Sequence, residues 1–284
     1  MFWSKYNFFF VLLHMITKTI MKKTLYSRFD KKDITPLPQV TFPGRIITII
    51  SAGEAEKAVD YLLSSDILGV DTETKPAFHK GEHHQVALLQ VSNRDTCFLF
   101  RLNLTGITPA IKRLLEDTTV KKIGLSWHDD LRGLQAREAF KPGLFVELQD
   151  LVPTLGVQDL SLQKLYANFF HLKMSKRQRL SNWEATILDE KQKQYAAIDA
   201  WTCINLYEEV VRLQKTHDYE LVSVETAEPQ AMSHDVSVNA AVGTEPVRNK
   251  KTRKARTRKT EGKGMTAKRR TKKTQGQVIE NSNV

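Results

Sequence analysis

The chain has 284 residues, of which 41% are hydrophobic and 26% charged, so it can form one sizeable core and allows one or two domains. Thirteen glycines and nine prolines exclude a collagen-like or wholly low-complexity chain, and two cysteines exclude a disulfide-stapled fold and a zinc site of four thiolates. The net charge is +11, but residues 246–284 hold 14 basic and two acidic residues, so residues 1–245, with 29 basic and 30 acidic, carry a net charge of −1.

The first 20 residues contain an apolar run from Tyr6 to Ile16. This run is shorter than the roughly 20 residues that a membrane-spanning helix needs. A signal sequence has a positively charged segment before its apolar run and a small-residue cleavage site after it. Here only Lys5 precedes the run and no such cleavage site follows it. A second methionine, Met21, opens the sequence MKKT, and we expect the true start there, with residues 1–20 an upstream extension and residues 21–44 a lead-in. A membrane anchor or signal is the alternative, although we expect no stable membrane association.

Residues 45–217 have the pattern of a compact α/β domain. Short apolar runs bounded by polar or turn residues predict six strands, at 45–50, 67–72, 86–91, 96–100, 120–125 and 144–148. Apolar residues at helical spacing predict helices at 53–65, 108–115 and 130–140, and a helical remainder from 160 to 213. Strands that gather first, with helices afterwards and some alternation, indicate a mixed sheet flanked by helices.

The residues after this domain differ from it in composition. Residues 218–245 hold six acidic residues and no lysine or arginine, which indicates an acidic linker. Residues 246–284 carry a net charge of +12 and no apolar pattern, so we expect a disordered basic tail. Such a tail is typical of a segment that binds the backbone of a nucleic acid, and a solvated end without a partner is the alternative.

Both cysteines, Cys97 and Cys203, lie in apolar runs, so we expect them to be buried free thiols. Free thiols are typical of a reducing compartment, and we therefore expect a cytoplasmic location.

Two acidic residues, Asp71 and Glu73, stand two apart at the end of the strand predicted from residue 67. Residues two apart in a strand project from the same face, so the two carboxylates lie together. Like charges in a dry site repel each other unless a cation lies between them, which favours a hard divalent ion held by oxygen ligands. A solvated strand end is the alternative.

Two further places combine carboxylates with possible partners. Tyr195 and Asp199 are four apart in the helical remainder, so they stack on one helix face, where the phenol can orient a water beside a metal-binding carboxylate. Asp129 and Asp130 stand at the start of the helix predicted from residue 130, where capping the helix is the alternative to binding a ligand. His128 is less favoured as a ligand, because a lone histidine more often binds no metal.

In chain order these residues form one pattern: Asp-x-Glu after a strand, Gly124-x5-Asp130, then Tyr-x3-Asp in a late helix. The pattern resembles the 3′–5′ exonucleases of the DEDD superfamily, DEDDy branch, which include ribonuclease D and the exonuclease domain of Werner-type proteins. The likeness covers about residues 45–213 and includes the runs VALLQVS (86–92), CFLF (97–100), LSLQKLYANFF (160–170) and RLSNWEATILDEKQKQYAAIDAWTCINLYEEV (179–210). The tyrosine four residues before the last aspartate marks this branch, whereas the DEDDh branch has a histidine where this chain has Gln194.

The resemblance implies a ribonuclease H-like fold, with a mixed sheet of five strands and helices on both sides. It also implies a nuclease that hydrolyses phosphodiester bonds from the 3′ end of a nucleic acid and releases nucleoside 5′-monophosphates by a two-metal mechanism. The family's metal ligands fall on Asp71, Glu73, Asp130 and Asp199, which would hold two divalent ions, Mg²⁺ or Mn²⁺. Tyr195 takes the place of the tyrosine that positions the water. The acidic linker and basic tail stand where ribonuclease D has a helical accessory module.

For substrate binding, we expect one stacking residue and three cations: Phe78, Lys176, Arg177 and Arg179. Trp183 is favoured as a packing residue, and residues 80–84 predict an exposed loop with two solvated histidines. Four carboxylates and two ions serve either backbone, so DNA and RNA both stay open, as single strands or recessed 3′ ends. The runner-up is a non-catalytic nucleic-acid-binding protein that keeps the fold, and a membrane-tethered nuclease is the third possibility.

Overall fold

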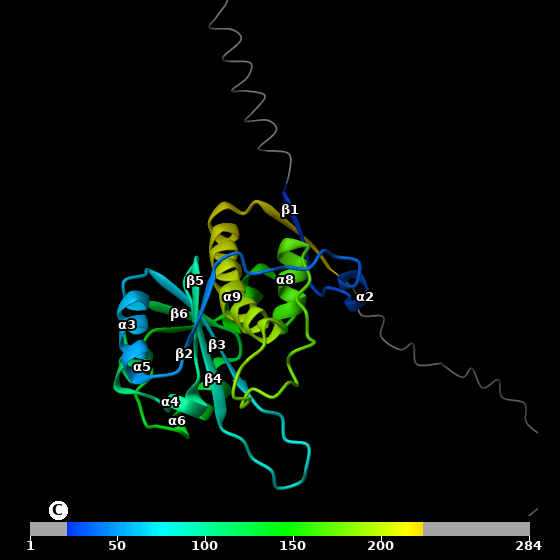
Figure 1. The fold of residues 1–284 in the computed structure, drawn as a ribbon. Coiled ribbons are helices and arrows are strands. Elements are labelled where there is room, and N and C mark those ends of the chain that lie inside the picture. Colours follow the sequence, from blue (N-terminus) through cyan, green and yellow to red (C-terminus); the bar gives the residue numbers. More distant parts are fainter. Residues whose placement is uncertain (1–21, 224–284) are drawn as a thin grey trace, which may run out of the picture. The chain divides into compact units, whose positions relative to one another are not determined.

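The computed structural model describes residues 22–223, which fold around one six-stranded mixed sheet (Figure 1). Its strands are β2 (Arg45–Ile49), β3 (Ile67–Thr74), β4 (Val86–Ser92), β5 (Thr96–Phe100), β6 (Lys121–Gly124) and β7 (Phe145–Glu147). Across the sheet they follow the order β2-β5-β4-β3-β6-β7. Strand β4 pairs antiparallel with β3 and β5, while the pairs β2–β5, β3–β6 and β6–β7 are parallel.

Helices cover both faces of this sheet (Figure 1). One core holds α3 (Ala52–Leu63), α5 (Pro109–Glu116) and α6 (Trp127–Gln135). The other holds the long helix α9 (Glu190–Thr216), which lies on the sheet, and α8 (Leu162–Phe170), which packs against α9. The shorter helices of residues 22–223 are α2 (Lys31–Ile34), α4 (Leu102–Thr105), α7 (Leu148–Leu151) and a 3₁₀ turn at Val152–Leu155.

The inner strands divide their side chains between the two cores. Leu89 and Phe98 lie in the core with α3 and α5, while their neighbours Leu88 and Leu99 lie in the core with α9. A strand that is buried on both faces needs this period of two with apolar residues throughout. Every residue of β4 and β5 is accordingly buried.

The predicted fold class, a mixed α/β sheet with helices on both sides, is confirmed, with one correction to the strand count. The resemblance implies five strands, and the structure has six. The additional strand is β2, which forms the edge of the sheet and pairs with β5 from Arg45 beside Thr96 to Ile49 beside Phe100. The apolar runs of the sequence predict a strand there.

The helical remainder predicted from 160 to 213 is two helices joined by a non-helical connecting segment, residues 172–189. Helix α8 ends at His171, whose backbone is left-handed with a φ of 53°. Helix α9 begins after a capping box in which the side chains of Asp189 and Gln192 each bond the other's backbone. The prediction was wrong here because a cap at each end interrupts what the sequence suggested was one helical stretch.

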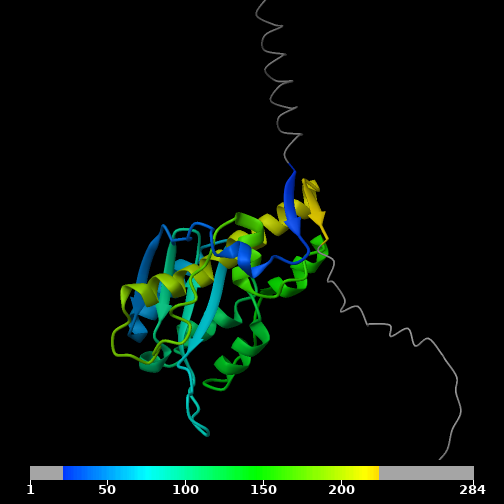
Figure 2. The ribbon, with the colours of Figure 1, turned by 90° about the vertical axis from the view of Figure 1, so that its right-hand side faces the viewer.

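The folded part extends beyond both ends of the predicted domain. Strands β1 (Lys23–Tyr26) and β8 (Tyr219–Val222) form a parallel pair next to the C-terminal end of α9 (Figure 2). Residues 219–222 therefore belong to the fold, which ends later than the boundary predicted at 217. The lead-in also packs on the domain, since the Val40 N–H donates to the Lys173 carbonyl oxygen at 3.0 Å.

Three predicted segments lie outside the described residues: the extension 1–20, the rest of the acidic linker (224–245) and the basic tail 246–284. Along residues 22–223, no helix is long and apolar enough to cross a bilayer. Both Cys97 and Cys203 are buried and free, as the sequence predicts.

Candidate active site

Strand β3 carries Asp71 and Glu73 on the face that α9 covers, and a glycine sets how close α9 comes. Gly69 lies two residues before Asp71 on the same face, and a Cβ there would stand 2.0 Å from the Ala200 carbonyl oxygen in α9. Glycine permits this approach because it has no Cβ. The approach brings Asp199, the residue before Ala200, next to strand β3.

Three carboxylates meet at this place. One oxygen from each of Asp71, Glu73 and Asp199 lies within 4.8 Å of the other two. Glu73 is 8% exposed and Asp199 is 7% exposed, while Asp71 is half-buried. The fold thus joins residues that the sequence placed in two separate motifs.

The fourth carboxylate, Asp130, reaches the cluster from the first turn of α6. Its Oδ1 accepts a hydrogen bond from the Thr72 hydroxyl, which lies between Asp71 and Glu73 in β3. Asp129, its neighbour, points to solvent and pairs with Arg132. Of these two aspartates, Asp130 is therefore the one that joins the site. We call the four acidic residues together the carboxylate site: Asp71, Glu73, Asp130 and Asp199.

Neither Asp129 nor Asp130 caps its helix. The N-cap residue of α6 is Ser126, whose side chain makes no capping bond. The Glu147 carboxylate instead accepts hydrogen bonds from the backbone N–H groups of Ser126 at 2.9 Å and Trp127 at 2.7 Å. Because Glu147 does the capping, Asp130 is free to face β3.

Tyr195 lies one turn before Asp199 in α9, and the interaction of its hydroxyl with the Asp199 carboxylate lowers the pKa of Asp199 against the larger effect of burial. The Tyr195 ring packs near Trp183, with 6.0 Å between the ring centroids. Trp183 itself is fully buried. It therefore supports Tyr195 by packing, as the sequence favours, and is not a surface on which a base could stack.

Burial raises the pKa of every carboxyl group in the site, and for Asp71 and Glu73 the charges of the neighbouring carboxylates raise it further. Burial, followed by the charges of Asp130, Asp199 and Glu73, raises the pKa of Asp71 well above its usual value. Burial likewise raises the pKa of Glu73 to about 9, that of Asp199 to about 7 and that of Asp130 to about 6. A group of this kind favours a bound proton or a bound cation.

The phenol of Tyr195 responds to the same surroundings. Burial first, and then the negative charges of Asp199 and Glu73, raise the pKa of Tyr195 above its usual value. Its hydroxyl therefore keeps its proton and can donate it in a hydrogen bond.

Two cavities open beside the carboxylates. The first, of about 250 Å³, is lined by Asp71, Tyr195 and Asp199 together with Lys176, Arg179 and the start of α8. The second, of about 430 Å³, shares Tyr195 and Asp199 and is lined further by Arg177, Gln178, Gln194 and lead-in residues 39–41. The three cations predicted to bind substrate thus all line a cavity next to the site, and they lie on the connecting segment.

The cations also act on the carboxylates over a longer range. The charge of Arg179 lowers the pKa of Glu73, and that of Lys176 lowers the pKa of Asp199, but in both cases burial outweighs the cation. Phe78, the predicted stacking residue, lies apart from them on the β3–β4 loop (residues 75–85) and is 71% exposed.

Sequence reasoning missed two residues that position the site, Thr72 and Glu147. Thr72 stands inside the Asp-x-Glu motif, and its hydroxyl was the available signal for a contact with a second acid. Glu147 lies in the strand predicted at 144–148, and nothing in the sequence connects it with the start of α6, 20 residues earlier. His128 is exposed and forms no part of the carboxylate cluster.

Comparisons with known proteins agree with this geometry. A family model described as 3′–5′ exonuclease matches residues 46–214. The mouse (Mus musculus) bifunctional 3′–5′ exonuclease/ATP-dependent helicase WRN is 30% identical over 190 residues, 63% of this chain and 14% of that protein. Exonuclease 3′–5′ domain-containing protein 2 of Drosophila melanogaster is 34% identical over 159 residues, 54% of this chain and 27% of the relative. The chain therefore spans less than a third of the length of these two relatives.

Another relative and two solved structures match over half or more of their own length. An Arabidopsis thaliana 3′–5′ exonuclease is 29% identical over 210 residues, 68% of this chain and 73% of that protein. The EXO domain of Aedes aegypti Nibbler superposes with a TM-score of 0.58 at 18% identity, over 64% of this chain and 95% of that one. Escherichia coli RNase D superposes with a TM-score of 0.52 at 18% identity, over 63% of this chain and 51% of that one. At such identities the structural likeness shows the shared ribonuclease H-like fold.

Proposed function

Because the chain belongs to the 3′–5′ exonuclease family, in its DEDDy branch, we propose that it hydrolyses phosphodiester bonds from the 3′ end of a nucleic acid strand and releases nucleoside 5′-monophosphates. One observation carries the proposal: Asp71, Glu73 and Asp199 converge from β3 and α9, with Asp130 held beside them. Buried carboxylates with raised pKa values destabilise the folded protein. Groups of this kind gather at catalytic sites, so the cluster favours a catalytic role.

The donor set of this site fits hard divalent ions. Carboxylate oxygens are the ligands that Mg²⁺ and Mn²⁺ prefer, and three of them converge without any histidine or thiolate among them. Asp71, Glu73 and Asp199 would hold one ion, and Asp130 would complete a second site that shares Asp71. When bound, two such ions would lower the pKa of a water and stabilise the departing 3′ oxygen.

The chain's own groups would orient the reaction. The Tyr195 hydroxyl keeps its proton and lies beside Asp199, so it can donate a hydrogen bond that orients the attacking water. Lys176 and Arg179 line the cavity that holds Asp71 and Asp199, where their charges can bind the phosphate oxygens on either side of the cleaved bond.

The proposed substrates are single strands and recessed 3′ ends, of DNA or RNA. The larger cavity, about 430 Å³, lies within the size range of small-molecule sites and can admit part of a nucleotide beside Tyr195. Exposed Phe78 is available to stack on a base. The relatives differ in their names, since one is a bifunctional exonuclease/helicase and the E. coli RNase D is described as an exoribonuclease involved in structured RNA processing. Whether the substrate is DNA or RNA therefore has to be tested.

One time course tests the proposal. The full chain is incubated with matched labelled RNA, single-stranded DNA and recessed duplex, in Mg²⁺, in Mn²⁺ and in excess EDTA. We expect stepwise shortening from the 3′ end, mononucleotide products and no activity in EDTA. Asp71→Asn should lose at least ~10³-fold in rate, because it removes a charged ligand that both ions would share. Asp129→Asn, which changes an exposed aspartate next to the site, is the control and should keep its rate.

The runner-up, a nucleic-acid-binding protein without catalysis, predicts a different result in the same experiment. It predicts binding of the strands with no shortening in either metal. Full activity in excess EDTA would instead reject the metal-dependent mechanism.

Two further proposals concern the whole protein. We propose that the basic tail, residues 246–284 with a net charge of +12, tethers long strands through their phosphates. We also propose a cytoplasmic location, because both cysteines are free thiols, and imaging of the tagged full chain tests it.

A further inference from the structure

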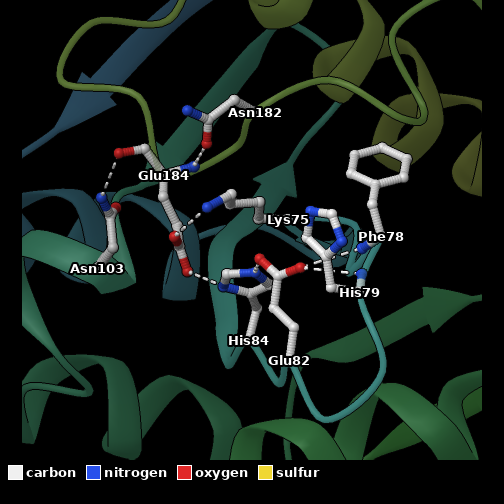
Figure 3. Close-up of polar contacts among 8 residues, drawn as sticks. All are labelled: Lys75, Phe78, His79, Glu82, His84, Asn103, Asn182 and Glu184. Carbon is white, nitrogen blue, oxygen red and sulfur yellow. Dashed lines mark hydrogen bonds and ion pairs between the residues drawn. The ribbon is translucent and has the colours of Figure 1, made fainter.

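Polar contacts outside the carboxylate site join the β3–β4 loop to the connecting segment (Figure 3). The loop contributes His84 and Glu82, and the connecting segment contributes Glu184. The sequence predicts both histidines of this loop to be solvated. His83 is exposed, but the His84 side chain is only 13% exposed, so that prediction was wrong for His84.

His84 lies between two carboxylates. Its Nε2 is 2.7 Å from Oε1 of Glu82, and its Nδ1 is 3.1 Å from Oε1 of Glu184. An ionised carboxylate accepts hydrogen bonds and donates none, so both contacts are hydrogen bonds only when both ring nitrogens carry a proton. The arrangement therefore fits the imidazolium form of the ring.

Both carboxylates are held by other groups as well. Oε2 of Glu82 accepts hydrogen bonds from the backbone N–H groups of Phe78 at 3.1 Å and His79 at 3.3 Å, which closes the tip of the loop. Oε2 of Glu184 lies 3.6 Å from Nζ of Lys75. The hydrogen bond with His84 lowers the pKa of Glu82, which keeps that carboxyl ionised. Turning either carboxylate away from an unprotonated nitrogen would break these contacts.

The connecting segment is the fixed partner in this contact. The Glu184 N–H donates to Oδ1 of Asn182 at 3.1 Å, and the next carbonyl oxygen, that of Ala185, accepts from buried Arg101. Asn103 of α4 lies at hydrogen-bond distance, 3.5 Å, from the Glu184 carbonyl oxygen. Burial lowers the pKa of Arg137 after α6, and the charge of Glu184 partly opposes this effect.

Both joined segments carry groups proposed to touch the substrate. The loop follows Glu73 directly and carries Phe78, while the connecting segment carries Lys176 and Arg179 in the wall of the site cavity. The contacts of His84 therefore set the spacing between the aromatic side chain on one segment and the cations on the other.

We propose that His84 is a positioning residue: as an imidazolium it clamps the β3–β4 loop onto the connecting segment and fixes the substrate-binding side of the active site. A neutral ring donates from one nitrogen only and turns a lone pair toward the other carboxylate, so one hydrogen bond gives way to repulsion. The effect of the clamp on substrate rests on the proposed function, but the clamp itself does not.

Hydrogen exchange at the Phe78 and His79 amides tests the clamp without any substrate. The full chain is compared with His84→Gln at pH 6, so that the intrinsic exchange rate cancels in the ratio. Losing charge-assisted hydrogen bonds should speed exchange in the variant roughly tenfold. His84→Arg keeps a cation with several donors, so its amides should stay protected.

Kinetics on a long single strand supply the second readout. At pH 6, His84→Gln should raise KM roughly tenfold and leave kcat nearly unchanged, because no group that contacts the reacting atoms is altered. His84→Arg, which keeps a cation at this position, should keep the wild-type KM. His83→Gln, in the exposed neighbour, is the matched control and should behave as wild type. If His84→Gln does not fold, Glu184→Gln removes the same charge pair from the other segment.

The outcomes separate the clamp from the proposed function. Amide exchange in His84→Gln at the wild-type rate, or a His84→Gln variant with the wild-type KM at pH 6, overturns the clamp. If the wild type shortens no nucleic acid while exchange is faster in His84→Gln and not in His84→Arg, the proposed function fails and the clamp stands.

Discussion

Replacing buried Asp199 with asparagine should stabilise the metal-free protein at pH 8. Burial raises the pKa of Asp199 to about 7, so at pH 8 the folded protein holds an ionised carboxylate in surroundings that disfavour its charge. In the unfolded chain that carboxylate is solvated and has no such penalty. Asparagine has nearly the same shape and carries no charge, so it removes the penalty from the folded state.

The magnitude follows from the pKa. The ordinary pKa of an aspartate is 3.8, and that of Asp199 is about 7. Each pKa unit corresponds to about 1.36 kcal/mol, so the ionised carboxylate lowers the free energy of unfolding by about 4 kcal/mol at pH 8. The pKa of about 7 already includes the interaction with Tyr195, which lowers it, so that interaction is not subtracted again. The gain of about 4 kcal/mol should raise the Tm by roughly 8–16 °C in a domain of this size.

The gain should depend on pH with a definite sign. A carboxyl group whose pKa is raised in the folded state binds its proton more tightly there than in the unfolded chain, so its penalty is absent below about pH 4. The penalty grows as pH rises and is complete above about pH 7. Thermal unfolding followed by circular dichroism in EDTA at pH 5 and pH 8 measures this difference. The variant's advantage should be large at pH 8 and much smaller at pH 5.

Divalent ions should reduce the difference in stability between the two proteins. Ions that bind the folded state at 100 times their Kd add about 2.7 kcal/mol to its stability, and the variant lacks one of the proposed ligands. In Mg²⁺ or Mn²⁺ the wild type should therefore gain more than Asp199→Asn. Asp129→Asn, on the exposed side of α6, should change stability by less than about 0.5 kcal/mol in every condition. A lower Tm for Asp199→Asn than for wild type in EDTA at pH 8 would refute the electrostatic argument.

Three further predictions concern activity and substrate. Asp130→Asn should lower the rate at least ~10³-fold while Asp129→Asn keeps it, because only Asp130 reaches β3; equal rates for the two variants would contradict the assignment. Tyr195→Phe should lower kcat by ~10²-fold, near the lower end of what an orienting group contributes, with metal affinity measured by titration calorimetry almost unchanged; a collapse of metal binding would make Tyr195 structural. Truncation at residue 223 removes the tail and keeps β8, so it should raise KM for long strands and weaken the salt dependence of their binding. On a log–log plot of affinity against salt concentration, each phosphate contact of a single strand contributes roughly 0.7 to the slope. Identical slopes before and after truncation would exclude the tether.

The strands of the sheet were predictable from the sequence because burial on both faces leaves a continuous apolar run. The strands TCFLF and VALLQVS each contribute side chains to both cores. The pair β1 and β8 was missed for the opposite reason. KTLY and YELV are four residues long, and their pairing joins positions almost 200 residues apart, so the signal is not local.

The carboxylates of the site could be named from the sequence, but the groups that hold them could not. The order and spacing of Asp71, Asp130 and Asp199 carried the resemblance, whereas the local patterns alone left a solvated strand end or a helix cap as alternatives. Glu147 and His84 act across long chain separations through backbone N–H groups and through irregular loops. A period in the sequence reports which face of a regular element is buried, and it carries no such information for loops.

The cations near the carboxylate site also bear on how it works. Lys176, Arg177 and Arg179 stand on the connecting segment around the site cavities, yet within residues 22–223 none of them forms an ion pair with any of the four carboxylates. An arginine placed among the carboxylates would lower their pKa values and stabilise the fold, but it would occupy the place of a divalent ion. Kept at the cavity walls, the same cations leave the carboxylates to bind metal and remain free to bind phosphates. The instability expected at Asp199 and the exposure of the cations therefore have one physical cause, which is that opposite charges of the protein are held apart at this site.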